Sequence, residues 1–213
     1  MSLINKYLFL LFFISFFILN GCNKKAEKVD TSILLKKYNS QVFLLKKVQE
    51  VLGKDVYFAV KGNFDNKNNL EIAAVKEINK IDTAGIQFFL LGLKETDLSV
   101  ISSTKILRGS LTKSFTNKIK FPFFNYELLY YNSNDYYIGS GGGEQFSYII
   151  NFKENEIYYS HLVSVSKKLG RIYISKNIKR KEIKNFFLSN AKRDFPNIKV
   201  SATDINIDDN ILY

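Results

Sequence analysis

The sequence predicts an α+β fold, mainly antiparallel β-sheet arranged as a meander or sandwich, with an N-terminal and a C-terminal amphipathic helix. Short runs of β-branched and aromatic residues recur through the middle of the chain, with turn residues between them. A stretch on each side of this region instead spaces its apolar residues as a helix does. Because no compelling repeat and no Pro- or Gly-rich linker breaks the pattern, residues 31–213 are expected to form a single β-rich domain.

The first helix is expected over 32–52. Residues 30–32 offer several N-cap side chains, apolar residues then recur at close to helical spacing, and Gly53 is a natural stop. The second helix, which is basic and amphipathic, is expected over 179–192.

The strands are expected where β-branched and aromatic residues alternate with polar ones or run together. The run 86–91 is continuously apolar, as in a strand buried on both faces. Residues 103–120 are polar and predict weaker structure, and a junction between two parts of the chain is the alternative there. The expected strands are 56–60, 70–75, 86–91, 98–102, 126–131, 136–138, 146–152, 157–165, 171–175 and 198–207.

The first 30 residues are typical of an export signal. A short polar start with Lys6 precedes residues 8–19, which are apolar except for Ser15. A run of this length suits the hydrophobic region of a signal peptide, about 7–15 residues. A membrane-spanning helix needs about 20 apolar residues. A buried helix is disfavoured because Lys24 and Lys25 follow closely.

Residues 19–22, Leu-Asn-Gly-Cys, resemble a lipobox, the processing motif of bacterial lipoprotein precursors. Leu19, Gly21 and Cys22 fit the pattern, and Asn20 departs from it. The resemblance implies cleavage after Gly21, removal of residues 1–21 as a signal peptide, and lipidation of Cys22 with fatty acids such as palmitate. Residues 22–30 would then tether the domain to a bacterial membrane. An uncleaved or ordinarily cleaved signal is the alternative.

The cysteine count agrees with this interpretation. Cys22 is the only cysteine, so a chain lipidated there would hold no free thiol and no disulfide. The covalent lipid on Cys22 is the only non-protein group that the sequence predicts. The inner or outer membrane, and its periplasmic or surface face, remain open.

The composition argues against nucleic acid as a partner, although the formal net charge is +11. The basic excess is nearly all lysine, and an exported protein meets no genome. A lysine-rich surface instead favours contact with anionic lipid headgroups, acidic glycans or another envelope protein.

The densest basic stretch is 167–184, which contains a single acidic residue, Glu182. One interpretation is a solvated strand edge followed by the polar face of a helix. The other is a contact with an anionic surface, and the candidate contact residues are Lys167, Lys168, Arg171, Lys179, Arg180 and Lys184.

Residues 62–71 lie between two expected strands and resemble a degenerate calcium loop of FG-GAP or VCBS-type repeats. Calcium prefers oxygen ligands, several of them anionic, and Lys67 introduces a positive charge at a ligand position. We therefore expect a structural hairpin turn, with a weak metal site as the alternative. The candidate ligands of that site are Asn63, Asp65 and Glu71. A similar order of segments occurs in uncharacterised secreted bacterial proteins, which implies a β-rich domain without implying an activity.

No catalytic residue is expected. His161 is the only histidine, and alternation places it on the same strand face as Tyr159 and Val163. The chain has no G-x-S-x-G motif for a nucleophile. The glycine-rich run 139–143 precedes a strand, so it predicts a hairpin rather than a phosphate-binding loop.

These features predict a membrane-anchored envelope lipoprotein that binds or scaffolds another envelope protein or an anionic surface and does not catalyse a reaction. Two other functions remain open. One is an envelope hydrolase that uses paired carboxylates, and the other is a weak calcium-dependent adhesin.

Overall fold

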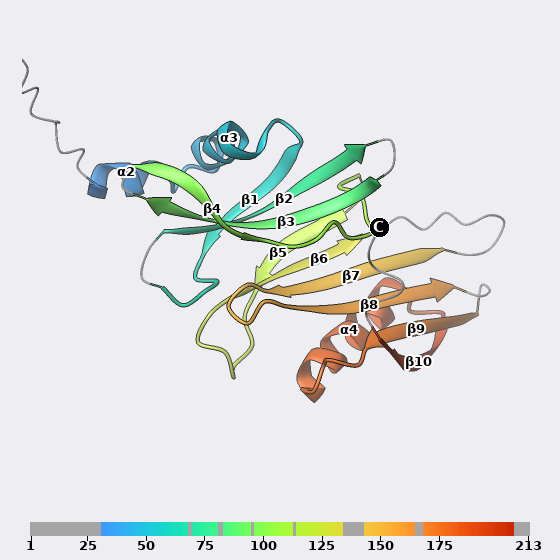
Figure 1. The fold of residues 1–213 in the computed structure, drawn as a ribbon. Coiled ribbons are helices and arrows are strands. Elements are labelled where there is room, and N and C mark those ends of the chain that lie inside the picture. The colour runs from blue at the N-terminus through green and yellow to red at the C-terminus, as the bar shows by residue number, and fades with distance from the viewer. Residues whose placement is uncertain are drawn as a thin grey trace, which may run out of the picture. The chain divides into compact units, whose positions relative to one another are not determined.

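The computed structural model describes residues 31–67, 70–80, 83–94, 96–112, 114–133, 143–164 and 168–206. One compact unit runs from Ser32 to Tyr213. The described residues form two β-sheets and three helices (Figure 1). The chain is therefore β-rich and of the α+β class, as the sequence predicts. The predictions for residues 1–30, including those for Gly21 and Cys22, lie outside the described residues.

Two short helices stand where the sequence predicts one helix over 32–52, so the prediction of a continuous helix is wrong. Helix α2 spans Thr31–Lys37 and helix α3 spans Gln41–Leu52. Ser40 is the N-cap of α3, and its side chain accepts a hydrogen bond from the Phe43 N–H. Serine favours this position because its hydroxyl competes with the backbone for hydrogen bonds inside a helix.

The first sheet holds four strands in an antiparallel meander. They are β1 (Val56–Gly62), β2 (Glu71–Lys80), β3 (Thr83–Lys94) and β4 (Asp97–Ser103), in that spatial order. β2 and β3 extend beyond the predicted ranges because they pair along their whole length, from Glu71 opposite Gly92 to Lys80 opposite Thr83. The apolar run 86–91 lies in β3.

The second sheet holds six strands. They are β5 (Ser114–Ile119), β6 (Leu128–Ser133), β7 (Glu144–Asn151), β8 (Glu156–Ser164), β9 (Leu169–Ser175) and β10 (Lys199–Ile205), and the spatial order is β10-β9-β8-β7-β6-β5. β10 pairs with β9 in parallel, unlike every other described pair. Helix α4 (Lys181–Asp194) lies between them in sequence and provides the crossover that a parallel pair requires.

The structure contains one strand, β5, that the sequence does not predict. One predicted strand falls where the structure describes no residues. β5 lies inside the polar stretch 103–120, for which the sequence predicts weaker structure. Six residues of β5 pair with β6, and this pairing stabilises the strand. Burial is incomplete there, since the Phe115 side chain is 50% exposed. The strand predicted at 136–138 lies outside the described residues.

Three groups of buried side chains hold the layers together. The first lies between the two sheets, since it contains Phe88 of β3 and Tyr148 of β7. The second joins α4, through Phe187, to the outer face of the second sheet. The third joins α3, through Val48, to the outer face of the first sheet. The layers thus follow the order helix, sheet, sheet, helix, and Figure 1 shows α3 and α4 on opposite sides of the pair of sheets.

The segment after β4 closes over the layer between the sheets. The hydroxyl of Tyr131 donates a hydrogen bond to the Ser110 carbonyl at 2.7 Å, and that of Tyr148 donates to the Arg108 carbonyl at 2.8 Å. Buried tyrosines need such partners. Gly109 adopts a φ of 148°, and a Cβ there would lie 2.6 Å from the Tyr131 hydroxyl, so the close approach requires glycine.

Candidate functional site

The turn between β1 and β2 is organised by one buried carboxylate. Glu71, the first residue of β2, is 1% exposed. Its Oε2 accepts hydrogen bonds from the N–H groups of Phe64 and Asp65, the second at 2.8 Å, and its Oε1 accepts one from the Lys67 N–H at 3.2 Å. One side chain thus accepts from three backbone donors of the turn, and it is the acceptor on which the Phe64 and Asp65 N–H groups depend.

Lys67, in the same turn, forms an ion pair with a second carboxylate, that of Asp65. The Lys67 ammonium is 2.6 Å from Asp65 Oδ2, and the Lys67 N–H donates to Asp65 Oδ1 at 3.0 Å. Burial opposes ionisation of Asp65, but hydrogen bonds with Glu71 and Lys67 outweigh it and hold the pKa of Asp65 below its usual value. Burial, followed by the hydrogen bond with Asp65, raises the pKa of Glu71. The Lys67 ammonium therefore supplies the positive charge beside the Asp65 carboxylate.

The backbone of the turn forms a hairpin, as the sequence predicts. Asn66 has a φ of 65°, and asparagine is one of the few residues besides glycine that readily adopts this left-handed conformation.

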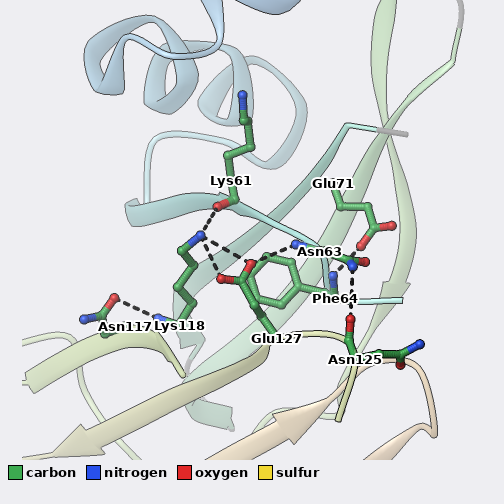
Figure 2. A network of polar contacts seen from close by, with 8 residues as sticks. All are labelled: Lys61, Asn63, Phe64, Glu71, Asn117, Lys118, Asn125 and Glu127. Carbon is green, nitrogen blue, oxygen red and sulfur yellow. Dashed lines mark hydrogen bonds and ion pairs between the residues drawn. The ribbon is translucent and has the colours of Figure 1, made fainter. Parts of the chain in front are cut away.

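Asn63, the third predicted ligand, does not lie with Asp65 and Glu71. Its N–H donates to Glu127 Oε2 at 2.9 Å, and its side-chain amide donates to the Asn125 carbonyl at 3.4 Å. Figure 2 shows the Asn63 side chain turned toward Asn125. Asn63 thus contacts Asn125 and Glu127, whereas the other two predicted ligands, Asp65 and Glu71, contact each other.

Lys118 of β5 joins the two sheets at this corner. Its ammonium lies 2.9 Å from Glu127 Oε1 and donates to the Lys61 carbonyl of β1 at 3.1 Å (Figure 2). A partly exposed ion pair contributes roughly 0–1 kcal/mol, so the contact fixes the position of β1 more than it adds stability. Sequence reasoning missed Lys118 and Glu127, because their partners are 57 and 64 residues away. No local pattern encodes such a pairing.

The chemistry available at this turn is limited by these contacts. A pocket of about 160 Å³ adjoins it and is lined in part by Asp65, Lys67 and Glu71. A metal ion bound to Asp65 would have to displace the Lys67 ammonium, and both Glu71 oxygens already accept hydrogen bonds. Within the described ranges, no group of three or more His, Cys, Asp or Glu side chains is placed to hold a metal ion.

Glu71→Ala is expected to lower the free energy of unfolding by about 3 kcal/mol, because it removes an acceptor from three N–H groups and leaves two of them, those of Phe64 and Asp65, with no acceptor. Glu71→Gln is the matched control and should cost less, since its carbonyl oxygen can still accept from two of them. Urea denaturation of both variants measures the difference. An Ala variant within about 0.5 kcal/mol of the wild type would contradict the structural role assigned to Glu71.

The basic candidates are spread over the β9–α4–β10 unit. Lys168 lies beside the start of β10, where its carbonyl accepts a hydrogen bond from the Lys199 N–H. Lys179 and Arg180 lie beyond the far end of β9, which is about 20 Å long. Lys168 and the pair Lys179–Arg180 therefore lie at opposite ends of β9, and Lys167 lies outside the described residues.

These basic side chains have partners of different kinds within the domain. Lys184 forms an ion pair with Asp204 of β10 at 2.8 Å. The Arg180 guanidinium lies 4.3 Å from the centre of the Phe123 ring, a distance typical of a cation–π contact. Arg171 instead projects from β9 on the face that carries Tyr173, with its Nη1 3.4 Å from the Tyr173 hydroxyl.

His161 of β8 packs between aromatic rings. Its ring stacks on Phe146 at 4.4 Å between centroids, and its Nε2 lies 2.9 Å from Glu144 Oε2. Burial lowers the pKa of His161, and Arg108 lowers it further, while Glu144 opposes the shift. Within the described part of the chain, Glu144 is the side chain that hydrogen-bonds to this ring. The arrangement orients a neutral imidazole but adds no nucleophile to it.

The burial of His161 predicts a pH dependence of stability. Its folded pKa lies below the unfolded value of about 6.5, so the unfolded chain binds more protons just below that pH. Stability should therefore fall as the pH drops from 7 to 5, by at most about 1.4 kcal/mol per pH unit for this group. Urea denaturation at both pH values should show a smaller loss for His161→Phe than for the wild type. An equal loss would contradict this assignment.

A second pocket, of about 270 Å³, lies between the end of β4 and the hairpin that joins β7 to β8. Its lining mixes hydroxyl groups such as that of Thr104, amides such as that of Asn155, and the ring of Phe152. Small-molecule sites usually measure about 300–1,000 Å³, so this pocket has room for a small polar ligand only.

In the part of the chain that the structure describes, none of the helices has both the length and the apolar character needed to cross a membrane. Comparison with family models, with curated proteins and with solved structures found no match. The functional argument therefore rests on the residues of this chain.

Proposed function

We propose that this protein is a membrane-anchored envelope lipoprotein whose β-rich domain binds or scaffolds a partner and does not catalyse a reaction. The observation that carries the proposal is the order of the first residues. An apolar run of signal-peptide length ends at Leu19, and Gly21 and Cys22 follow at the spacing of a lipobox. In this proposal residues 1–21 are removed and Cys22 carries the lipid.

The charged groups of the domain support a binding or scaffolding role over a hydrolytic one. Hydrolysis by paired carboxylates uses two acids about 5–9.5 Å apart with access to substrate. Asp65 and Glu71 instead hydrogen-bond to each other, and Glu71 is almost fully buried. His161 is engaged by Glu144 and by aromatic rings.

The same contacts weigh against a calcium-dependent adhesin. The Lys67 ammonium already neutralises Asp65, and Asn63 faces Asn125 and Glu127. Calcium would need several free oxygen ligands at this turn.

The proposal includes an amphipathic helix near each end of the domain. α3 buries Leu44 and Val48 while Lys46 remains exposed, and α4 buries Ile183 and Phe187. Helices of this kind cover the outer faces of the two sheets and leave charged side chains outside. These side chains are available to an anionic surface or to another envelope protein.

The anchor is tested by expressing the full chain in bacteria fed a clickable fatty acid. The wild type should be labelled and Cys22→Ala should not, because the sulfur of Cys22 is the proposed attachment site. Asn20→Ala is the matched control, and it should keep the label because it changes only the position that departs from the lipobox. Equal labelling of the wild type and Cys22→Ala would overturn the anchor.

A further inference from the structure

Helices α2 and α3 expose large apolar side chains to solvent. Ile33 is 55% exposed, Leu35 is 37% exposed and Val42 is 79% exposed. The first two lie in α2, and Val42 lies in the first turn of α3, just after the three-residue turn that joins the helices. Exposed apolar side chains that occur singly are common, but three within ten residues form a local concentration.

This exposure follows from how the two helices are fixed to the domain. Leu34 packs against the group of buried residues under α3, and Tyr38, at 2% exposure, packs edge-on against Phe43. Leu44 and Val48 lie on the face of α3 that packs against the first sheet. With these inward positions occupied, Ile33, Leu35 and Val42 face away from the core.

Lysines accompany the apolar side chains. Lys36, Lys37 and Lys46 are all exposed, and among the described residues none of them forms an ion pair. The one acidic residue of the two helices, Glu50, lies 2.6 Å from a fourth lysine, Lys47. We call the set of Ile33, Leu35, Val42, Lys36, Lys37 and Lys46 the α2–α3 surface. It combines apolar side chains with a positive charge, as interfacial helices do.

The position of this surface in the chain decides which partner it fits. Nine positions separate Cys22 from Thr31, where α2 begins, and a chain of this length spans at most about 32 Å. A lipid on Cys22 would therefore keep α2 close to the bilayer. Anionic headgroups complement the lysines, and the region just below the headgroups accepts apolar side chains.

We propose that the α2–α3 surface docks on the anionic lipid bilayer to which the protein is anchored. This inference rests on the proposed lipid attachment at Cys22 and adds an orientation to it. Ile33, Leu35 and Val42 enter the boundary between headgroups and acyl chains, while the three lysines contact anionic headgroups. The far end of the second sheet, at β9 and β10, then faces away from the membrane and is available to a partner.

The test uses the lipidated full chain, purified from membranes and reconstituted into vesicles. Because Cys22 is the only cysteine and its sulfur carries the lipid in the proposal, a cysteine introduced by Val42→Cys is the one site for a thiol-reactive fluorophore. Leu169→Cys on β9, where the native side chain is 53% exposed, is the matched control. Brominated lipids in the vesicles quench a fluorophore that enters the bilayer.

We expect quenching at position 42 and little at position 169 in vesicles that mix phosphatidylglycerol with phosphatidylcholine. Quenching at position 42 should be weaker in vesicles made of phosphatidylcholine only. Each lysine near an anionic surface strengthens binding about fivefold. Replacing all three, as Lys36→Gln, Lys37→Gln and Lys46→Gln, should therefore weaken docking about a hundredfold and abolish the quenching at position 42. Circular dichroism shows whether each variant folds.

Two different failures are separated by this design. A chain that still holds Cys22 as a thiol would take up the fluorophore without any introduced cysteine, and that result overturns the lipid attachment itself. A lipidated chain with equal quenching at positions 42 and 169, or with none at either, overturns the docking alone. Quenching at position 42 that does not depend on phosphatidylglycerol or on the three lysines overturns the recognition of anionic lipid.

Discussion

The layer of buried side chains between the two sheets is the constraint on which the rest of the structure depends. Phe88 of the first sheet meets the rings of Tyr131 and Tyr148 from the second at centroid distances of 5.7 and 6.2 Å. Burial of aromatic side chains is the largest favourable contribution available to a chain without disulfides. It also imposes a cost, since each buried hydroxyl needs an acceptor. The segment after β4 provides acceptors for Tyr131 and Tyr148, through the Ser110 and Arg108 carbonyls respectively.

The same requirement explains what several charged groups near the sheets do in the structure. Glu71 holds three N–H groups of a turn, and Lys118 with Glu127 holds β1 against the second sheet. These three charged side chains therefore hold neighbouring segments of the chain together. Several other lysines, such as Lys36, Lys37 and Lys46, are exposed on helices. A membrane or a partner can reach these side chains in the binding or scaffolding role that we propose.

The sequence predicted the fold class and most strands, because apolar residues alternate or cluster where the sheets bury them. It failed where a distant contact decides the structure. β5 is polar and forms because β6 pairs with it, and the parallel direction of β10 depends on the crossover by α4. The expected helix over 32–52 is broken at Ser40, which caps α3 instead of continuing a helix. At the candidate site, the sequence indicated that Lys67 opposes calcium, but the role of Glu127 depends on a partner 64 residues away.

Intact-mass spectrometry of the protein extracted from membranes reads the processed N-terminus and the lipid together. We expect a chain that begins at Cys22 and carries the added mass of a lipid on that residue. The mass of the unprocessed 213-residue chain, 24.6 kDa, would contradict the account. A shorter chain with an unmodified Cys22, or one that begins at another residue, would contradict it equally.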